Sequence, residues 1–221
     1  AAEATRSIRT LLDLNPLKST VSRILVTSTI SAEGKTGTSI RLAIAFARLG
    51  RKVLLVDADL RRPTVHKVFN ANRNPGLTQL FDGAALSSAV NATEIPNLHF
   101  LPAGSSKSNG IELLASTKMN DILENAQQQF DLIIIDTPPA GFLADAAILS
   151  RGVDGVLFVV REYTASRVQI QEAIQGLQNV GANIFGVVIN AVDLHRHGKP
   201  YSYYGYGYGY GYSANYRYVA E

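Results

Sequence analysis

Six short apolar runs, separated by stretches of helical length, constrain the fold of this 221-residue chain more than any other feature. They are nearly continuous in hydrophobicity and rich in β-branched residues, which is typical of strands covered on both faces of a sheet. Their alternation with helical stretches predicts an α/β fold, with a mostly parallel central sheet and helices on both faces. The expected strands are 23–28, 52–59, 97–102, 131–136, 155–160 and 183–190. The expected helices are 2–12, 37–49, 111–129, 144–151 and 165–180.

Composition excludes several classes of protein. The chain has no cysteine, which rules out a disulfide scaffold, a zinc finger and a cysteine-ligated iron–sulfur site. Its net charge is only +3 and 18% of its residues are charged, so the dense basic face of a nucleic-acid binder is absent and no nucleic-acid partner is expected. No uninterrupted apolar run approaches the length needed to span a bilayer, so this fragment is expected to be soluble.

The first expected strand leads into a loop that ends like a phosphate-binding motif. Gly34-Lys35-Thr36 matches the end of G-x-x-x-x-G-K-[ST], with Thr29 in place of the first glycine, which predicts the fold of a P-loop NTPase. Gly34 allows backbone N–H groups to close on phosphates, Lys35 would reach the β- and γ-phosphates, and the Thr36 hydroxyl suits Mg²⁺. An ordinary βα turn with a surface lysine is the alternative, which the strand–loop–helix context disfavours. The expected ATP-binding residues of the loop are Thr29, Ser31, Ala32, Glu33, Gly34, Lys35, Thr36 and Gly37.

Acidic residues end two further expected strands. Asp57 and Asp59 close one of them and Asp136 closes another. A single aspartate in such a place is usually a turn or cap residue. Three of them at the carboxyl edge of a parallel sheet, where ligands bind, are better explained by Mg²⁺ binding and catalysis. Thr36, Asp59 and Asp136 are therefore the expected Mg²⁺ ligands, and Lys35, Asp57, Asp59 and Asp136 the expected catalytic residues.

Nine of the ten tyrosines lie in the last 21 residues. Because segment 198–221 has little aliphatic content, it is expected to be a flexible tail that follows a folded domain spanning residues 1–197. Glycines alternate with Tyr206, Tyr208, Tyr210 and Tyr212, and such a backbone could present a tyrosine to an active site in many registers. An adhesive low-complexity segment is the alternative.

These motifs together resemble the bacterial tyrosine kinases of capsule and exopolysaccharide export. Gly34-Lys35-Thr36 is similar to the end of their Walker A motif, 56–61 (VDADLR) to Walker A′, and 133–139 (IIIDTPP) to Walker B. Glu3, Arg6 and Arg9 match their E-x-x-R-x-x-R oligomerisation motif, and the tyrosine-rich end matches their autophosphorylated cluster. The similarity covers nearly all of the chain, and five motifs in this order are specific.

The resemblance implies a protein-tyrosine autokinase that uses ATP and Mg²⁺ and phosphorylates its own tail in trans within a ring-like homo-oligomer. It also implies that Asp57 accepts the tyrosine proton, although the spacing alone does not show which role belongs to Asp57 and which to Asp59. The implied partner is a membrane-embedded polysaccharide co-polymerase, in the same chain or a separate one, at the cytoplasmic face of the bacterial inner membrane. The implied role is regulation of capsular or exopolysaccharide synthesis and export. The expected phosphoacceptors are Tyr201, Tyr203, Tyr204, Tyr206, Tyr208, Tyr210, Tyr212, Tyr216 and Tyr218.

Two of the expected functional roles have an alternative explanation that the sequence leaves open. Asn190, at the end of the last expected strand, is expected to touch adenine, with a turn residue as an equal alternative. Glu3, Arg6 and Arg9 share one helix face within about 120°. That face is expected to contact a neighbouring subunit, although a solvated Glu–Arg pair is the simpler alternative.

The main alternative function is an ATP-switched positioning or scaffold ATPase of the same fold, without tyrosine kinase activity. Those proteins carry an additional lysine directly after the first Walker glycine, where this chain has Ile30. An aliphatic side chain cannot neutralise phosphate charge on a dimer partner, and such proteins do not typically end in a tyrosine tail. The sequence therefore favours the kinase.

Overall fold

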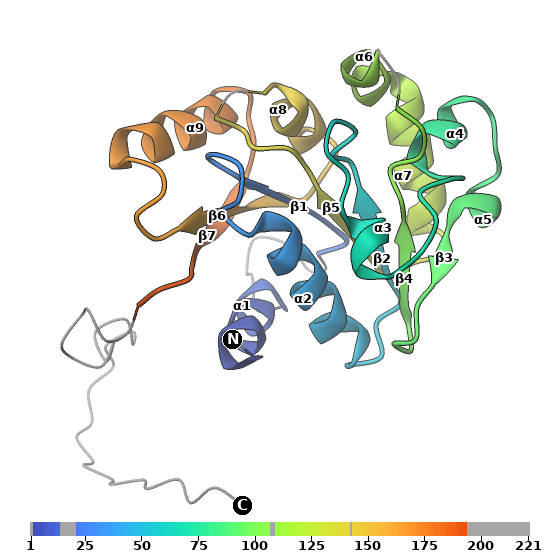
Figure 1. Cartoon of the computed structure of the whole chain (residues 1–221), viewed down its shortest axis with the longest axis horizontal. Coiled ribbons are helices and arrows are strands. Elements are labelled where there is room, and N and C mark those ends of the chain that lie inside the picture. The colour runs from blue at the N-terminus through green and yellow to red at the C-terminus, as the bar shows by residue number, and fades with distance from the viewer. Residues whose placement is uncertain (1, 14–20, 107–108, 142, 194–221) are drawn as a thin grey trace, which may run out of the picture.

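The computed structural model describes residues 2–13, 21–106, 109–141 and 143–193 (Figure 1). Its centre is a seven-stranded sheet with the order β3-β4-β2-β5-β1-β6-β7, parallel except for β3, which runs antiparallel to β4. The expected tail 198–221 and its nine tyrosines lie outside the described residues. The strands are β1 (Arg23–Ser28), β2 (Val53–Asp57), β3 (Asn91–Ala92), β4 (Leu98–Leu101), β5 (Leu132–Asp136), β6 (Gly155–Arg161) and β7 (Ile184–Asn190).

Helices cover both faces of the sheet (Figure 1), as the sequence predicts for strands of this kind. One face carries α1 and α2, and the other carries α6 to α9. Within the described residues, no helix is both long and apolar enough to cross a bilayer. The helices are α1 (Ala2–Asp13), α2 (Lys35–Ala47), α3 (Val65–Val68), α4 (Leu77–Phe81), α5 (Leu86–Ala89), α6 (Gly110–Ala115), α7 (Thr117–Gln127), α8 (Asp145–Ser150) and α9 (Arg167–Asn179).

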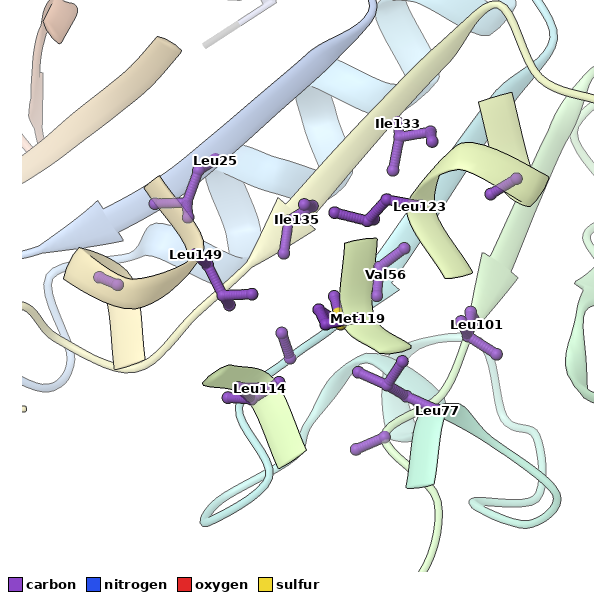
Figure 2. Packing of buried hydrophobic residues seen from close by; sticks show 14 of the residues in the cluster. Leu25, Val56, Leu77, Leu101, Leu114, Met119, Leu123, Ile133, Ile135 and Leu149 are labelled. Atoms are coloured by element: carbon purple, nitrogen blue, oxygen red, sulfur yellow. The ribbon is translucent and has the colours of Figure 1, made fainter. Parts of the chain in front are cut away.

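Two hydrophobic cores lie on the opposite faces of the sheet because successive strand residues point in opposite directions. Figure 2 shows the core under α6 to α8, where Leu25 and Ile135 of the strands face Leu149, Met119 and Leu123 of the helices. All five side chains are at most 3% exposed. The β-strands at the centre of the sheet therefore form a rigid base for the loops at their carboxyl ends.

The structure differs from the sequence expectation in several short elements. The expected helix 111–129 is two helices, because the backbone of Ser116 is extended and its hydroxyl donates to the Leu113 carbonyl at 2.6 Å. Strand β3 and the short helices α3, α4 and α5 were not predicted. Helix α2 begins at Lys35, two residues before its expected start. The fold class itself is confirmed.

The order of the strands brings the functional loops together. Strands β2, β5 and β1 are adjacent and parallel, with Asp57 opposite Asp136 and Asp136 opposite Val26 in the register. The carboxyl ends of these strands therefore meet at one edge, which is the edge where α/β sheets bind ligands.

Candidate active site

The loop between β1 and α2 is shaped by a glycine in the left-handed region. Gly34 has φ 92° and ψ 20°, and it immediately precedes the first residue of α2. A Cβ atom added there would lie 2.0 Å from Nδ2 of Asn190, which donates a hydrogen bond to the Glu33 carbonyl at 3.1 Å. Gly34 is therefore favoured by its left-handed conformation, and a larger residue there would also have to displace the side chain of Asn190 from the loop.

The substitution Gly34→Ala is expected to reduce ATP affinity more than tenfold. Gly181→Ala is a matched control, because Gly181 has φ 84° but nothing lies within 4 Å of an added Cβ atom. Both variants should lose about 1 kcal/mol or more of stability through left-handed backbone strain, measured by thermal unfolding. Only Gly34→Ala should weaken binding of a fluorescent ATP analogue, and equal binding by the two variants would contradict the assigned role of the loop.

Glu33 supports the loop from inside the protein. Its side chain is fully buried. Oε2 accepts a hydrogen bond from the Ile30 N–H at 2.8 Å, while Oε1 accepts from the Arg161 N–H at 3.3 Å and from the Thr164 hydroxyl at 3.2 Å. The carboxylate therefore joins two residues of the loop to each other and links the loop to the end of β6 through hydrogen bonds.

Replacing this carboxylate is expected to loosen the loop. Glu33→Ala leaves the N–H groups of Ile30 and Arg161, whose hydrogen bonds are part-buried, without these acceptors, at a cost of about 1–3 kcal/mol in unfolding free energy. It should also weaken binding of the fluorescent ATP analogue about tenfold. Glu33→Gln keeps one oxygen acceptor and should recover part of both losses. Glu172→Ala, which removes an exposed carboxylate from α9, is the control; unchanged ATP affinity in Glu33→Ala would show that the contacts do not shape the loop.

Lys35 and Thr36 at the start of α2 contact two of the expected carboxylates. Nζ of Lys35 lies 3.3 Å from Oδ2 of Asp59, and the Thr36 hydroxyl donates to Oδ2 of Asp136 at 2.6 Å. Ser39, one turn further along α2, donates to the other oxygen of Asp136 at 3.0 Å. The Walker loop, the end of β2 and the end of β5 are therefore joined through polar side chains.

Asp57 and Asp136 are fully buried, and their pKa values are raised. Burial raises the pKa of Asp57 to about 7, and the charge of Asp136 adds to this, although N–H groups of Val65 and Thr64 donate to Asp57 at 3.0 Å. Burial likewise raises the pKa of Asp136 to about 6 against the opposing effects of Lys35, Thr36 and Ser39. A carboxylate with a pKa near neutrality is suited to accept a proton.

A cleft of about 560 Å³ opens beside these groups. Asp59 lies on its wall together with Ile30 of the loop, and Pro138, Pro139 and Leu143 contribute apolar surface. Arg61 and Arg62, which follow β2, also line it. Asp57 is not among the lining residues, so Asp59 is the carboxylate that faces this cleft.

The remaining expected site residues have varied positions. Thr29 is buried, Ser31 is exposed, and Ala32 has φ 67°. Asn190 lies against the loop backbone, and its Oδ1 accepts from the Ala191 N–H at 3.0 Å. An adenine contact by Asn190 remains a prediction.

Two features of the site were missed by sequence reasoning. One is Ser39 as a partner of Asp136, and the only signal was the run of small residues at the start of α2. The other is the structural role of Glu33, whose side chain holds the loop in place from inside the protein. The sequence predicts Glu33 only as one of the ATP-binding residues of the loop. Among the described residues, the motif residues Glu3, Arg6 and Arg9 lie on α1, away from the carboxylates.

The fold and the phosphate loop define a P-loop NTPase, and a family model described as an AAA domain matches residues 23–186. Tyrosine-protein kinase YwqD of Bacillus subtilis is 35% identical over 205 residues, which are 92% of this chain and 86% of YwqD. Putative tyrosine-protein kinase EpsB of Ralstonia solanacearum is 36% identical over 98% of this chain, which spans 28% of EpsB. The kinase domain of Escherichia coli tyrosine kinase ETK is 31% identical with a TM-score of 0.83, covering 96% of this chain and 80% of that chain.

The chain therefore belongs to the bacterial tyrosine-protein kinases, a family of enzymes within the P-loop class. The septum site-determining protein MinD from Pyrococcus horikoshii, complexed with Mg-ADP, is 24% identical with a TM-score of 0.65. That match covers 76% of this chain and 69% of MinD and shows a shared fold alone. The kinase expectation is thus confirmed at the level of the family, in preference to the positioning ATPases.

Proposed function

We propose that this chain transfers the γ-phosphoryl group of ATP to tyrosines of its own segment 201–218, between copies of the chain. The observation that carries the proposal is the meeting of Lys35, Thr36, Asp59 and Asp136 beside an open cleft, in a chain that also holds nine clustered tyrosines. Such a site combines phosphate binding with carboxylates, which is what phosphoryl transfer requires.

In the proposed reaction, the tyrosine oxygen forms a bond to the γ-phosphorus while the bond from that phosphorus to the β,γ-bridging oxygen breaks. ADP leaves, and Asp57 accepts the proton of the tyrosine hydroxyl. Lys35 would exchange its contact with Asp59 for the γ-phosphoryl oxygens and neutralise their charge. The raised pKa of Asp57 supports its role as the base, and the role also requires that binding of ATP and the acceptor opens the cleft to this fully buried carboxylate.

The donor set fits a magnesium ion that binds with the nucleotide. The Thr36 hydroxyl and the carboxylates of Asp59 and Asp136 are hard oxygen ligands, which Mg²⁺ prefers. Within the described part of the chain, no three histidine or acidic side chains form a ready-made metal site. This agrees with an ion held mostly by phosphate oxygens and water, with few protein ligands. When bound, it would neutralise charge on the phosphate oxygens.

The cleft beside Asp59 is the proposed entrance for the acceptor. The faces of Pro138, Pro139 and Leu143 would pack against a tyrosine ring, while the hydroxyl points toward the phosphate loop. The acceptors would be the nine tyrosines between Tyr201 and Tyr218. Glycines between them leave the backbone free to adapt to the cleft.

The broader setting of the enzyme follows from the family resemblance. We infer a ring-like homo-oligomer in which Glu3, Arg6 and Arg9 of α1 contact a neighbouring subunit. We further infer activation by a membrane-embedded polysaccharide co-polymerase at the cytoplasmic face of the inner membrane, and a role in capsule or exopolysaccharide export. This chain spans only 28% of the relative EpsB, so some relatives contain further segments beyond the part that matches.

Transfer between copies can be tested by mixing two variants. Lys35→Met would be inactive but would keep its acceptors, whereas a chain with all nine tail tyrosines replaced by phenylalanine would be active without them. The proposal predicts labelled phosphotyrosine in the Lys35→Met chain, at a rate that rises with the concentration of the second variant. Label in wild-type protein, but none in the mixture, would instead show transfer within one chain.

A further inference from the structure

A groove lined by arginines lies between α1 and α2, away from the catalytic carboxylates. Figure 1 shows α1 lying against α2 at the lower edge of the molecule. The groove encloses about 470 Å³. It is lined by Arg6 and Arg9 of α1, by Arg41 in the middle of α2 and by Arg48, which directly follows α2, and no acidic residue lines it. We call this feature the arginine groove.

The charges of the arginine groove lack partners within the described chain. Arg6, Arg9, Arg41 and Arg48 form no ion pair with any described residue. Arg41 donates one hydrogen bond, to the Thr38 hydroxyl at 3.3 Å, and Nε of Arg9 is buried without a hydrogen-bond partner. Four guanidinium groups in one groove repel one another, so an anion that accepts several N–H bonds would bind favourably.

The groove also has an apolar surface. Ile44 and Ala45, both half-buried on α2, lie between the arginines. A free phosphate ion would contact only the guanidinium groups. An aryl phosphate would satisfy both features, because its ring would cover Ile44 while its phosphate oxygens accept from the arginines.

We propose that the arginine groove binds phosphotyrosine of the chain's own segment 201–218. This rests on the proposed function, which would create that group on this chain. Tyr208 follows the last described residue, Asp193, by 15 residues, which span about 50 Å when extended. Tyr208 can therefore bind at a groove that lies within about 50 Å of Asp193, in its own copy or in a neighbour.

The charges of the arginine groove and of the phosphorylated segment are complementary. Segment 201–221 contains Arg217 and Glu221 and is close to neutral before phosphorylation. Each phosphotyrosine adds about −1.5 to −2, and the groove offers four positive charges. Arg6 and Arg9 belong to the motif expected to contact the next subunit, so an occupied groove would withdraw them from that contact.

The test measures binding of a synthetic peptide with the sequence of residues 205–211, labelled with fluorescein and phosphorylated at the position of Tyr208. The protein is the full Lys35→Met chain, which would carry no phosphotyrosine of its own. The proposal predicts saturable binding by fluorescence anisotropy, with no binding of the unphosphorylated peptide. Inorganic phosphate should compete only at concentrations at least about a hundredfold above those of the phosphopeptide.

Arg41→Gln/Arg48→Gln in the same background should weaken phosphopeptide binding at least tenfold. Arg151→Gln/Arg167→Gln removes two exposed arginines elsewhere and is the matched control, with folding of both variants checked by thermal unfolding. Equal loss in both double variants would show attraction by net charge alone and overturn the proposal. A changed sedimentation coefficient with unchanged phosphopeptide binding would also overturn it, by assigning the groove to a second copy. Because the probe is synthetic, the result is independent of whether the chain phosphorylates itself.

Discussion

Lys35→Met is expected to lower the rate of tyrosine phosphorylation by about 10³-fold or more. Lys35 is the cation at the start of α2, and its Nζ lies 3.3 Å from Asp59, at the wall of the cleft. Methionine keeps the approximate length of the side chain but removes the charge that stabilises the transferring phosphoryl group. The initial rate of label transfer from γ-labelled ATP, measured with anti-phosphotyrosine detection as a second readout, checks this.

The control for this loss is Lys67→Met, which removes an exposed lysine from α3. It should retain nearly full activity, and thermal unfolding should show that both variants are folded. The assigned role of Lys35 would be contradicted if Lys35→Met kept more than a tenth of the wild-type rate.

Asp57→Asn is expected to reduce the catalytic rate by about 10²-fold or more and, at the same time, to stabilise the metal-free protein at pH 8. The first effect follows from loss of the proposed base. The second follows from burial, which raises the pKa of Asp57 to about 7 from an ordinary value of 3.8. The charged form of Asp57 is therefore unfavourable in the folded chain, and asparagine removes that penalty.

The sign of the pH dependence follows from proton binding. Between pH 3.8 and pH 7, the folded state keeps the proton of Asp57 that the unfolded state releases, so wild-type stability falls as the pH rises through this window. At pH 8, in EDTA, Asp57→Asn should be more stable by on the order of 2 kcal/mol, or about 4–8 °C in melting temperature. Near pH 4 this advantage should disappear.

Asp121→Asn removes an exposed carboxylate from α7 and controls for the change in net charge. Its melting temperature should differ from wild type by a similar amount at both pH values. If the difference in melting temperature between Asp57→Asn and wild type were also the same at both pH values, burial would not raise the pKa of Asp57. If it kept full kinase activity, another group would accept the proton.

Much of the fold was predictable because its central strands are continuous apolar runs. The ends of β1 and β5 lie at, or within one residue of, the expected positions. Strand β3 could not be predicted, because its two residues form a strand only by pairing with β4, at Phe100 and His99. The short helices α3, α4 and α5 have at most five residues, too few to show a helical period.

In the candidate site too, residues that belong to local motifs were predictable, whereas roles that depend on contacts far apart in the sequence were not. Lys35 and the carboxylates at the strand ends were identifiable because a parallel sheet brings its carboxyl ends to one edge. The bracing role of Glu33 was not, because its partners Arg161 and Thr164 are 128 and 131 residues away in the sequence. The different surroundings of Asp57 and Asp59 also required the fold, since Asp59 contacts Lys35 and lines the cleft, whereas Asp57 accepts hydrogen bonds from Thr64 and Val65.

The most direct test of the central claim is to incubate the purified chain with γ-labelled ATP and Mg²⁺ and to locate the label by mass spectrometry. Transfer to the chain's own tail predicts phosphotyrosine between Tyr201 and Tyr218 and none in the chain whose nine tail tyrosines are phenylalanine. Tyr163, which is 74% exposed and is the one tyrosine outside that segment, is an internal control and should stay unlabelled. Release of free phosphate without phosphotyrosine, or label on Tyr163 alone, would contradict the account.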